Sequence, residues 1–156
     1  MHRKHWQIEG GVNCVLCDQN ILETRDHLFF DCAFARLCWE TVGVTWNPLV
    51  TIFQHVDAAR MRHTGPCFLE VFVCVTWNIW KARNELIFRD IPPALGRWKI
   101  KFKNDILLYQ YRVKKSLVTP LLEWIRNSSP YFFEGNYCIL LDVFSIRTTL
   151  DILLCI

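Results

Sequence analysis

Residues 14–17 read Cys-Val-Leu-Cys, and residues 23–32 read Glu-Thr-Arg-Asp-His-Leu-Phe-Phe-Asp-Cys. Nine residues separate Cys17 from His27, and four separate His27 from Cys32. Both sulfurs of a Cys-x-x-Cys turn can face one ion, and a Cys3His set suits Zn²⁺ in a closed tetrahedron. The spacing therefore predicts one structural zinc site, around which a small lobe folds, with the ligands Cys14, Cys17, His27 and Cys32.

A Cys-x-x-Cys motif also has two other interpretations. It can be two buried thiols without a metal, or a redox pair, which needs a strand before it and a helix that opens at the motif. The flanks Gly10-Gly11 and Asp18-Gln19-Asn20 favour turns instead. A histidine and a third cysteine at workable spacing favour the metal.

The composition is that of a folded chain. Of its 156 residues 52% are hydrophobic, so the chain can bury a core and is not disordered. The net charge of +3 permits an anionic partner without requiring one. We expect a mainly α fold, with a zinc-binding hairpin-helix lobe over residues 1–45, a region of a few packed helices over 46–127 and an apolar tail over 128–156.

The remaining cysteines do not suggest a secreted protein. The N-terminal residues have no apolar run that could act as a signal segment. The cysteines outside the motif lie among large apolar residues, where a free thiol behaves as a small buried hydrophobe: Cys38, Cys67, Cys74, Cys138 and Cys155. We expect a reduced, intracellular protein of the nucleus or cytoplasm.

Residues 137–156 are long and apolar enough to raise the question of a membrane span. The apolar side chains would gain about 5 kcal/mol on insertion, whereas Asp142, Arg147 and Asp151 would cost about 6–10 kcal/mol together. No membrane partner is therefore expected.

The lobe is predicted in three parts. A two-stranded hairpin over residues 12–26 uses Ile21 and Leu22 as its return strand. Thr24 or Asp26 caps a helix that contains His27 and breaks near Cys32. A second helix is predicted over residues 33–42, with Gly43 as its C-cap. The side chains of this helix that are expected to face the core are Phe34, Leu37, Cys38 and Trp39.

Further helices are predicted from apolar residues that recur at steps of four and three. A short helix is expected around residues 49–59. A central helix over 67–88 carries the stripe Phe68, Phe72, Val75, Ile79, Ala82 and Leu86, and Pro92-Pro93 follows its end. A third helix over 94–117 carries the stripe Trp98, Phe102, Ile106, Tyr109, Val113 and Leu117. Thr119-Pro120 predicts the start of a fresh short helix over 121–126.

The two motifs of the first 39 residues, together with Leu28, Phe29 and Trp39, resemble the reverse-transcriptase zinc-binding domain. That domain is found at the C-terminal end of plant LINE-type (non-LTR) retrotransposon polyproteins. Residues 77–88, Trp-Asn-Ile-Trp-Lys-Ala-Arg-Asn-Glu-Leu-Ile-Phe, resemble the helix that commonly follows it. The resemblance implies that the matched Cys, Cys, His and Cys bind zinc and that Leu28, Phe29 and Trp39 are core residues. Ala33 departs from the family, where a proline is frequent.

The chain is not expected to be an enzyme by itself. A polymerase needs clustered carboxylates that hold two metal ions, and no Asp-Asp pair occurs in the sequence. No nucleotide-binding glycine loop and no Gly-x-Ser-x-Gly motif is present either, and no small-molecule substrate is expected.

Two roles remain open for such a non-catalytic chain. It can be an accessory module that contacts RNA or DNA through basic residues, for which the candidates are Arg3, Lys4, Arg25, Arg36, Lys81, Arg83, Lys101 and Lys103, with Trp6 or another exposed aromatic residue stacking on a base. It can instead be a structural module that packs against a reverse transcriptase body, or an inactive fragment derived from a retroelement.

Overall fold

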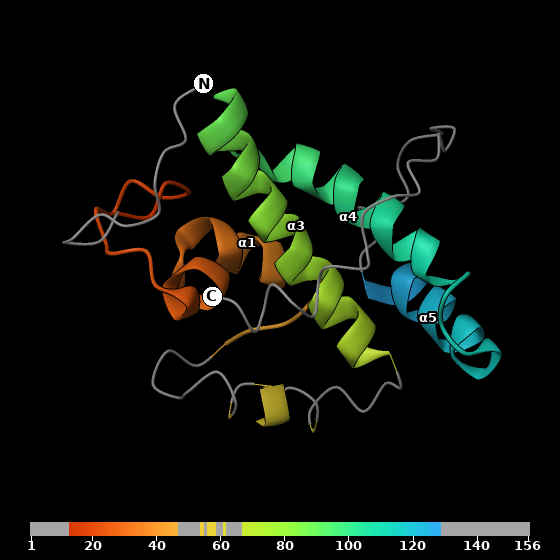
Figure 1. The fold of residues 1–156 in the computed structure, drawn as a ribbon. Helices are drawn as coiled ribbons and strands as arrows, with labels where there is room; N and C mark the ends of the chain where they lie inside the picture. Colours follow the sequence, from red (N-terminus) through yellow and green to blue (C-terminus); the bar gives the residue numbers. More distant parts are fainter. Residues whose placement is uncertain (1–12, 47–53, 55, 59–60, 62–66, 129–156) are drawn as a thin grey trace.

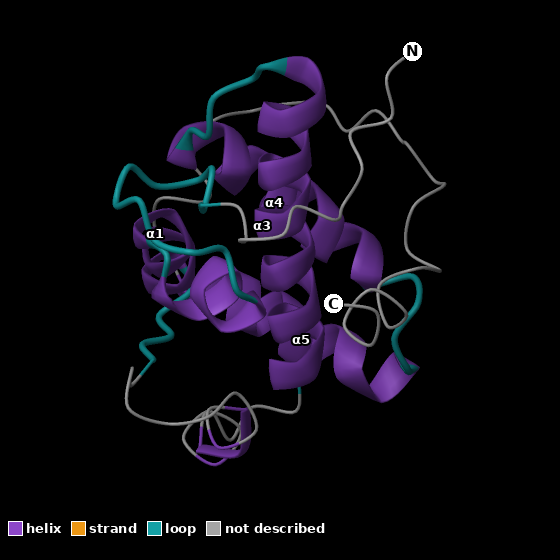
Figure 2. Ribbon diagram, turned by 60° about the vertical axis from the view of Figure 1, so that its left-hand side comes forward, coloured by secondary structure: helices purple, strands orange, loops and turns teal. Residues whose placement is uncertain are grey.

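The computed structural model describes residues 13–46, 54, 56–58, 61 and 67–128. The named elements are η1 (His27–Asp31), α1 (Ala33–Thr41), α3 (Phe68–Arg89), α4 (Leu95–Tyr109) and α5 (Lys115–Ser128), and residues 54, 56–58 and 61 are also helical. Helix α3 runs through the middle of the molecule, with α1 on one side and α4 on the other (Figure 1). Helices make up nearly all of the regular structure (Figure 2), so the predicted mainly α class is confirmed.

Helix α3 is central because apolar residues cover most of its circumference. It contacts α1, η1 and α4, and ten of its side chains are buried, among them Phe72, Val75 and Ile79 of the predicted stripe. Helix α4 buries Trp98, Phe102 and Ile106 against it. The predicted central helix is therefore confirmed, and Asp90 ends it in a left-handed conformation (φ 53°) two residues before the prolines.

The segments of the lobe follow one another in the predicted order, but the first of them is less regular than the predicted hairpin. Among the described residues the two expected strands reduce to one antiparallel bridge between Asn13 and Leu22. The helical segment that contains His27 breaks at Cys32, as predicted, and α1 begins at the next residue. Gly43 adopts the positive φ of 74° that the predicted C-cap requires.

The third predicted helix, residues 94–117, is wrong in its second half. Helix α4 ends at Tyr109, and α5 starts at Lys115 after a hydrogen-bonded turn. This turn returns the chain to the start of α3, where the Cys67 Sγ lies 3.6 Å from the Leu117 carbonyl oxygen. The four-three spacing continues across the break, so the pattern alone could not reveal it.

Pro120 does not begin a new helix, which corrects the prediction for residues 121–126. It lies inside α5, where its missing N–H removes one helical hydrogen bond. The helix starts earlier because Leu121 and Ile125 are buried in the core and Leu117, one turn before Leu121, packs against it. One continuous helix places all three side chains on the same face.

The remaining expectations concern single segments of the chain. Leu37 was predicted to point inward, but 46% of it is exposed, because α1 directs Phe34, Cys38 and Trp39 to the core. Of the short helix expected around residues 49–59, the structure describes residues 54 and 56–58, which are helical. The tail expected over 128–156 lies outside the described residues except for residue 128. Within the described part of the chain, no helix is both long and apolar enough to cross a membrane.

Candidate metal centre

The four predicted ligands meet at one point of the lobe. One donor atom from each of Cys14, Cys17, His27 and Cys32 lies within 4.8 Å of the others. Cys14 and Cys17 come from the turn that follows the bridge, and His27 and Cys32 flank the wide helical turn η1. The structure thus positions these four residues to hold a metal ion.

Two distances between donor atoms are those expected around a tetrahedral zinc ion. Cys14 Sγ lies 3.8 Å from Cys32 Sγ, and Cys17 Sγ lies 3.4 Å from His27 Nε2. With Zn–S near 2.3 Å and Zn–N near 2.05 Å, a tetrahedron places two sulfurs about 3.8 Å apart and a sulfur and a nitrogen about 3.5 Å apart. Three thiols and one imidazole would fill all four positions, as structural zinc sites require.

Local hydrogen bonds hold the two halves of the centre. The Cys14 N–H donates to the Ile21 carbonyl oxygen over 2.8 Å, which closes the turn that carries Cys17. The His27 N–H donates to Thr24 Oγ1 over 3.1 Å, so Thr24 is the capping residue, one of the two that the sequence predicted.

A wide helical turn brings the other two ligands together. The Cys32 N–H donates to the His27 carbonyl oxygen over 2.7 Å, a bond that spans five residues instead of the four of an α-helix. The two ligand residues are therefore joined through their own backbones. Such wide turns frequently occur at functional sites.

Burial makes the free thiols weak acids in the absence of a cation. Cys14 and Cys32 are 4% and 0% exposed. Burial raises the pKa of Cys14 to about 12 and also raises the pKa of Cys32. A divalent cation reverses this effect because it stabilises the thiolates that bind it.

An aromatic cluster connects the metal lobe, residues 13–46, to α3. The Trp39 indole N–H donates to the Phe29 carbonyl oxygen over 2.6 Å. The Trp39 ring lies 5.5 Å from the ring of Phe72 on α3 and 4.8 Å from that of Trp46. Trp39 and Phe29 are core residues, 0% and 2% exposed, as the resemblance implied.

An ion pair adds a second connection between the metal lobe and α3. Glu23 Oε1 accepts hydrogen bonds from Arg83 Nε at 2.8 Å and from Arg83 Nη2 at 2.6 Å. The side chains are only 12% and 9% exposed. Sequence reasoning missed this pair because sixty positions separate its members. Glu23 lies in the quoted segment 23–32 and Arg83 in the quoted segment 77–88, both of which carry the resemblance.

The eight basic residues that the sequence suggests for nucleic-acid contact are distributed as follows. Arg3 and Lys4 lie outside the described residues. Five of the others pair with acidic side chains: Arg25 with Asp26, Arg36 with Asp31, Lys81 with Asp105, Arg83 with Glu23 and Lys101 with Glu85. Lys103 is half-buried on α4. Their contact with nucleic acid stays a prediction.

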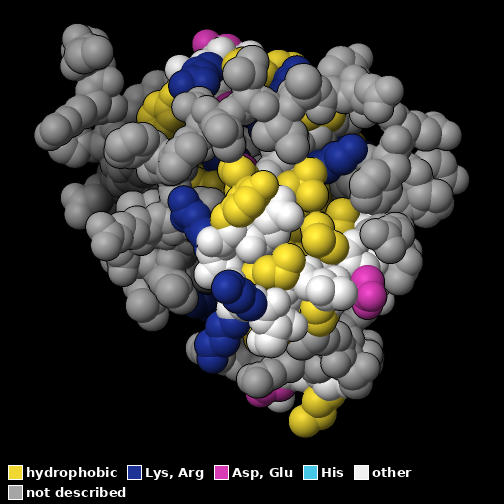
Figure 3. All heavy atoms as spheres, turned by 90° about the vertical axis from the view of Figure 1, so that its right-hand side faces the viewer, with side chains coloured by type: hydrophobic (Ala, Val, Ile, Leu, Met, Phe, Trp, Pro, Cys, Tyr) yellow, Lys and Arg dark blue, Asp and Glu magenta, His cyan; other side chains and the backbone are white. Residues whose placement is uncertain are grey.

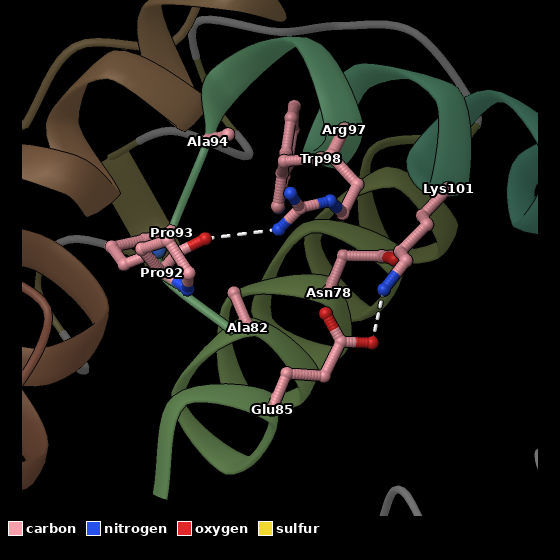
Figure 4. A pocket seen from close by; sticks show the side chains of 9 residues that line it. All are labelled: Asn78, Ala82, Glu85, Pro92, Pro93, Ala94, Arg97, Trp98 and Lys101. Atoms are coloured by element: carbon pink, nitrogen blue, oxygen red, sulfur yellow. Dashed lines mark hydrogen bonds and ion pairs between the residues drawn. The ribbon is translucent and has the colours of Figure 1, made fainter. Parts of the chain in front are cut away.

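A hollow between α3 and α4 offers little room for a ligand (Figure 4). Its volume is about 10 Å³, which suits one water molecule rather than an organic molecule. Its charged side chains are engaged locally, since Arg97 donates to the Pro92 carbonyl oxygen over 2.9 Å and Lys101 pairs with Glu85. The metal centre is the stronger functional candidate.

These features define a helical protein with a Cys3His metal centre in its N-terminal lobe. Residues 1–39 match the sequence model of a family described as zinc-binding in reverse transcriptase. The match covers all four ligands and ends at Trp39. No curated protein and no solved structure matches the chain.

Proposed function

We propose that the chain is a zinc-binding accessory module of a reverse transcriptase, non-catalytic by itself, in which Cys14, Cys17, His27 and Cys32 hold one structural Zn²⁺. The observation that carries this proposal is the convergence of the four donor atoms, all within 4.8 Å of one another, with 3.8 Å between Cys14 Sγ and Cys32 Sγ and 3.4 Å between Cys17 Sγ and His27 Nε2. The family match over the same residues supports zinc as the metal.

The role of the zinc is to order the metal lobe. With three sulfurs and one nitrogen bound, a tetrahedral ion has no open position for a substrate. The lobe in turn presents its aromatic residues and Glu23 to α3. The module would then assist a polymerase body in contacting RNA or DNA, and Arg25 and Arg36 of the lobe are partly exposed for this role.

The test is the zinc content of the purified chain and of two matched variants. Cys17→Ser removes a ligand, whereas Cys38→Ser makes the same change at a buried thiol of the same lobe that is not a ligand. We expect about one zinc per chain in the parent and in Cys38→Ser and much less in Cys17→Ser. Equal zinc in the two variants would contradict the ligand assignment.

A second candidate function is a structural module that packs against another protein. Large apolar side chains remain exposed on the two long helices: Leu69 at 63%, Phe88 at 67% and Ile100 at 62%. Association with a polymerase fragment without any binding to nucleic acid would favour this function. A chain that aggregates persistently and holds no zinc would instead be an inactive retroelement fragment.

A further inference from the structure

The turn between α4 and α5 carries an unusual set of exposed side chains. Tyr111 is 79% exposed, although tyrosine usually buries most of its ring. Arg112, Lys114 and Lys115 are exposed beside it in the sequence. One aromatic ring and three cations thus lie within five consecutive positions.

The packing of the turn explains why these side chains point outward. Tyr109, Val113 and Leu117 pack against the core and anchor the turn. The Arg112 N–H and the Val113 N–H both donate to the Tyr109 carbonyl oxygen, over 2.9 and 3.0 Å. The backbone is therefore fixed, and the residues between the anchors face solvent.

The cations of this turn differ from most of those discussed above, because no acidic side chain of residues 13–46 or 67–128 pairs with them. Arg112, Lys114 and Lys115 form no ion pair with another residue that the structure describes. In contrast, Lys81, Arg83 and Lys101 pair with carboxylates of neighbouring segments. Within the described residues, the positive charge at the turn is thus not compensated by an ion pair.

The start of α5 increases this positive charge. Helix N-termini carry a partial positive charge and favour acidic residues, yet Lys115 opens α5 and its first turn contains no acid. Cations at this place cost stability, so an anionic ligand would relieve the repulsion. Lys and Arg side chains lie beside hydrophobic ones on the face that contains the ends of α4 and α5, with the visible acidic side chains at its edges (Figure 3).

We propose that this turn is a binding surface for single-stranded nucleic acid, on which Tyr111 stacks with a base while Arg112, Lys114 and Lys115 contact phosphates. Exposed aromatic rings beside cations are the combination that single strands recognise, because each base has a face for stacking and each linkage has a charge. The proposal rests on the proposed accessory function and gives it a surface distinct from the metal lobe.

The test is the binding of the full chain to a fluorescent single-stranded 20-mer, as RNA and as DNA, over a series of salt concentrations. We expect Lys114→Ala/Lys115→Ala to make the slope of log K against log salt shallower by about 1.4, since each phosphate contact contributes about 0.7 for single strands. We expect Tyr111→Ala to weaken binding about 5- to 150-fold and leave the slope unchanged.

The matched control is Arg89→Ala/Arg97→Ala, which removes two exposed cations where α3 ends and α4 begins. It should change the affinity less than twofold, and the reverse pattern would overturn the proposal. Binding to anionic phospholipid vesicles but not to the 20-mer would also overturn it. Zinc content is measured on the parent chain and on every variant. Undiminished binding by the Tyr111 and Lys114/Lys115 variants with one zinc per chain contradicts this surface alone, whereas a parent chain without zinc contradicts the proposed function.

Discussion

Residues 13–46 contain one isolated bridge, one wide helical turn and one short helix, whereas residues 67–128 consist almost entirely of three longer helices. The metal lobe directs three thiols and an imidazole to one point. The helical body, α3 to α5, instead buries apolar side chains along its length, such as Phe102 and Ile79. The lobe thus has a candidate metal centre in addition to its share of the core, and we expect it to depend on the metal more than the body does.

The sharpest test of this comparison is removal of the metal. Apparent zinc-binding energies of about 10–16 kcal/mol in small zinc domains make this the largest expected effect. A chelator should increase hydrogen exchange strongly at the ligand-bearing segments of the lobe, while amides in the middle of α3 stay protected. An equal loss of protection in both regions would show that they do not differ in this way.

The reverse test weakens the core of the body. Phe102 is 1% exposed, and Phe102→Ala should lower the free energy of unfolding by about 3–5 kcal/mol because it leaves a cavity. Urea unfolding measures this change, and the folded variant should still bind zinc. Ile100→Ala is the control on the same helix, since Ile100 is 62% exposed and should change stability by about 0.5 kcal/mol or less.

The Glu23–Arg83 pair tests how strongly the two regions are joined. Glu23→Gln leaves the buried guanidinium without its counter-charge, and we expect a loss on the order of 3 kcal/mol. Asp26→Asn breaks an exposed pair with Arg25 and should cost about 1 kcal/mol or less. Equal costs for the two variants, measured by urea unfolding, would mean that burial adds nothing to the first pair.

The smallest expected effect concerns the cap of the ligand-bearing helical segment. Thr24→Ala removes the acceptor for the His27 N–H and should cost about 1 kcal/mol. Thr41 provides the control, because its hydroxyl donates to the Leu37 carbonyl oxygen on an exposed surface. Thermal unfolding compares the stabilities of the two variants. If Thr41→Ala loses more stability than Thr24→Ala, the Thr24 cap does not stabilise the lobe.

The metal centre could be predicted because its ligands lie close together in the sequence. Four ligands within 19 positions, and Thr24 three residues before His27, are spacings that a sequence displays directly. Helix α3 could be predicted equally well, because a long run of apolar residues at helical spacing is compatible with few structures other than a helix.

The parts that could not be predicted depend on contacts between distant segments. The helix breaks after Tyr109 because the chain turns back toward α3, where Leu117 contacts Cys67, fifty positions earlier in the sequence. Pro120 suggested a helix start on local grounds, but burial of Leu121 and Ile125 outweighed that preference. The Glu23–Arg83 pair likewise required knowledge of which segments meet.

The Glu23–Arg83 pair also has a consequence for the order of events during translation. The ribosome adds about 5–20 residues per second, so the sixty positions between the two residues correspond to a delay of about 3–12 s. All four metal ligands precede Arg83 and are complete at Cys32. Zinc can therefore organise the lobe while Glu23 still faces water, and the arrival of Arg83 then docks a lobe that is already formed.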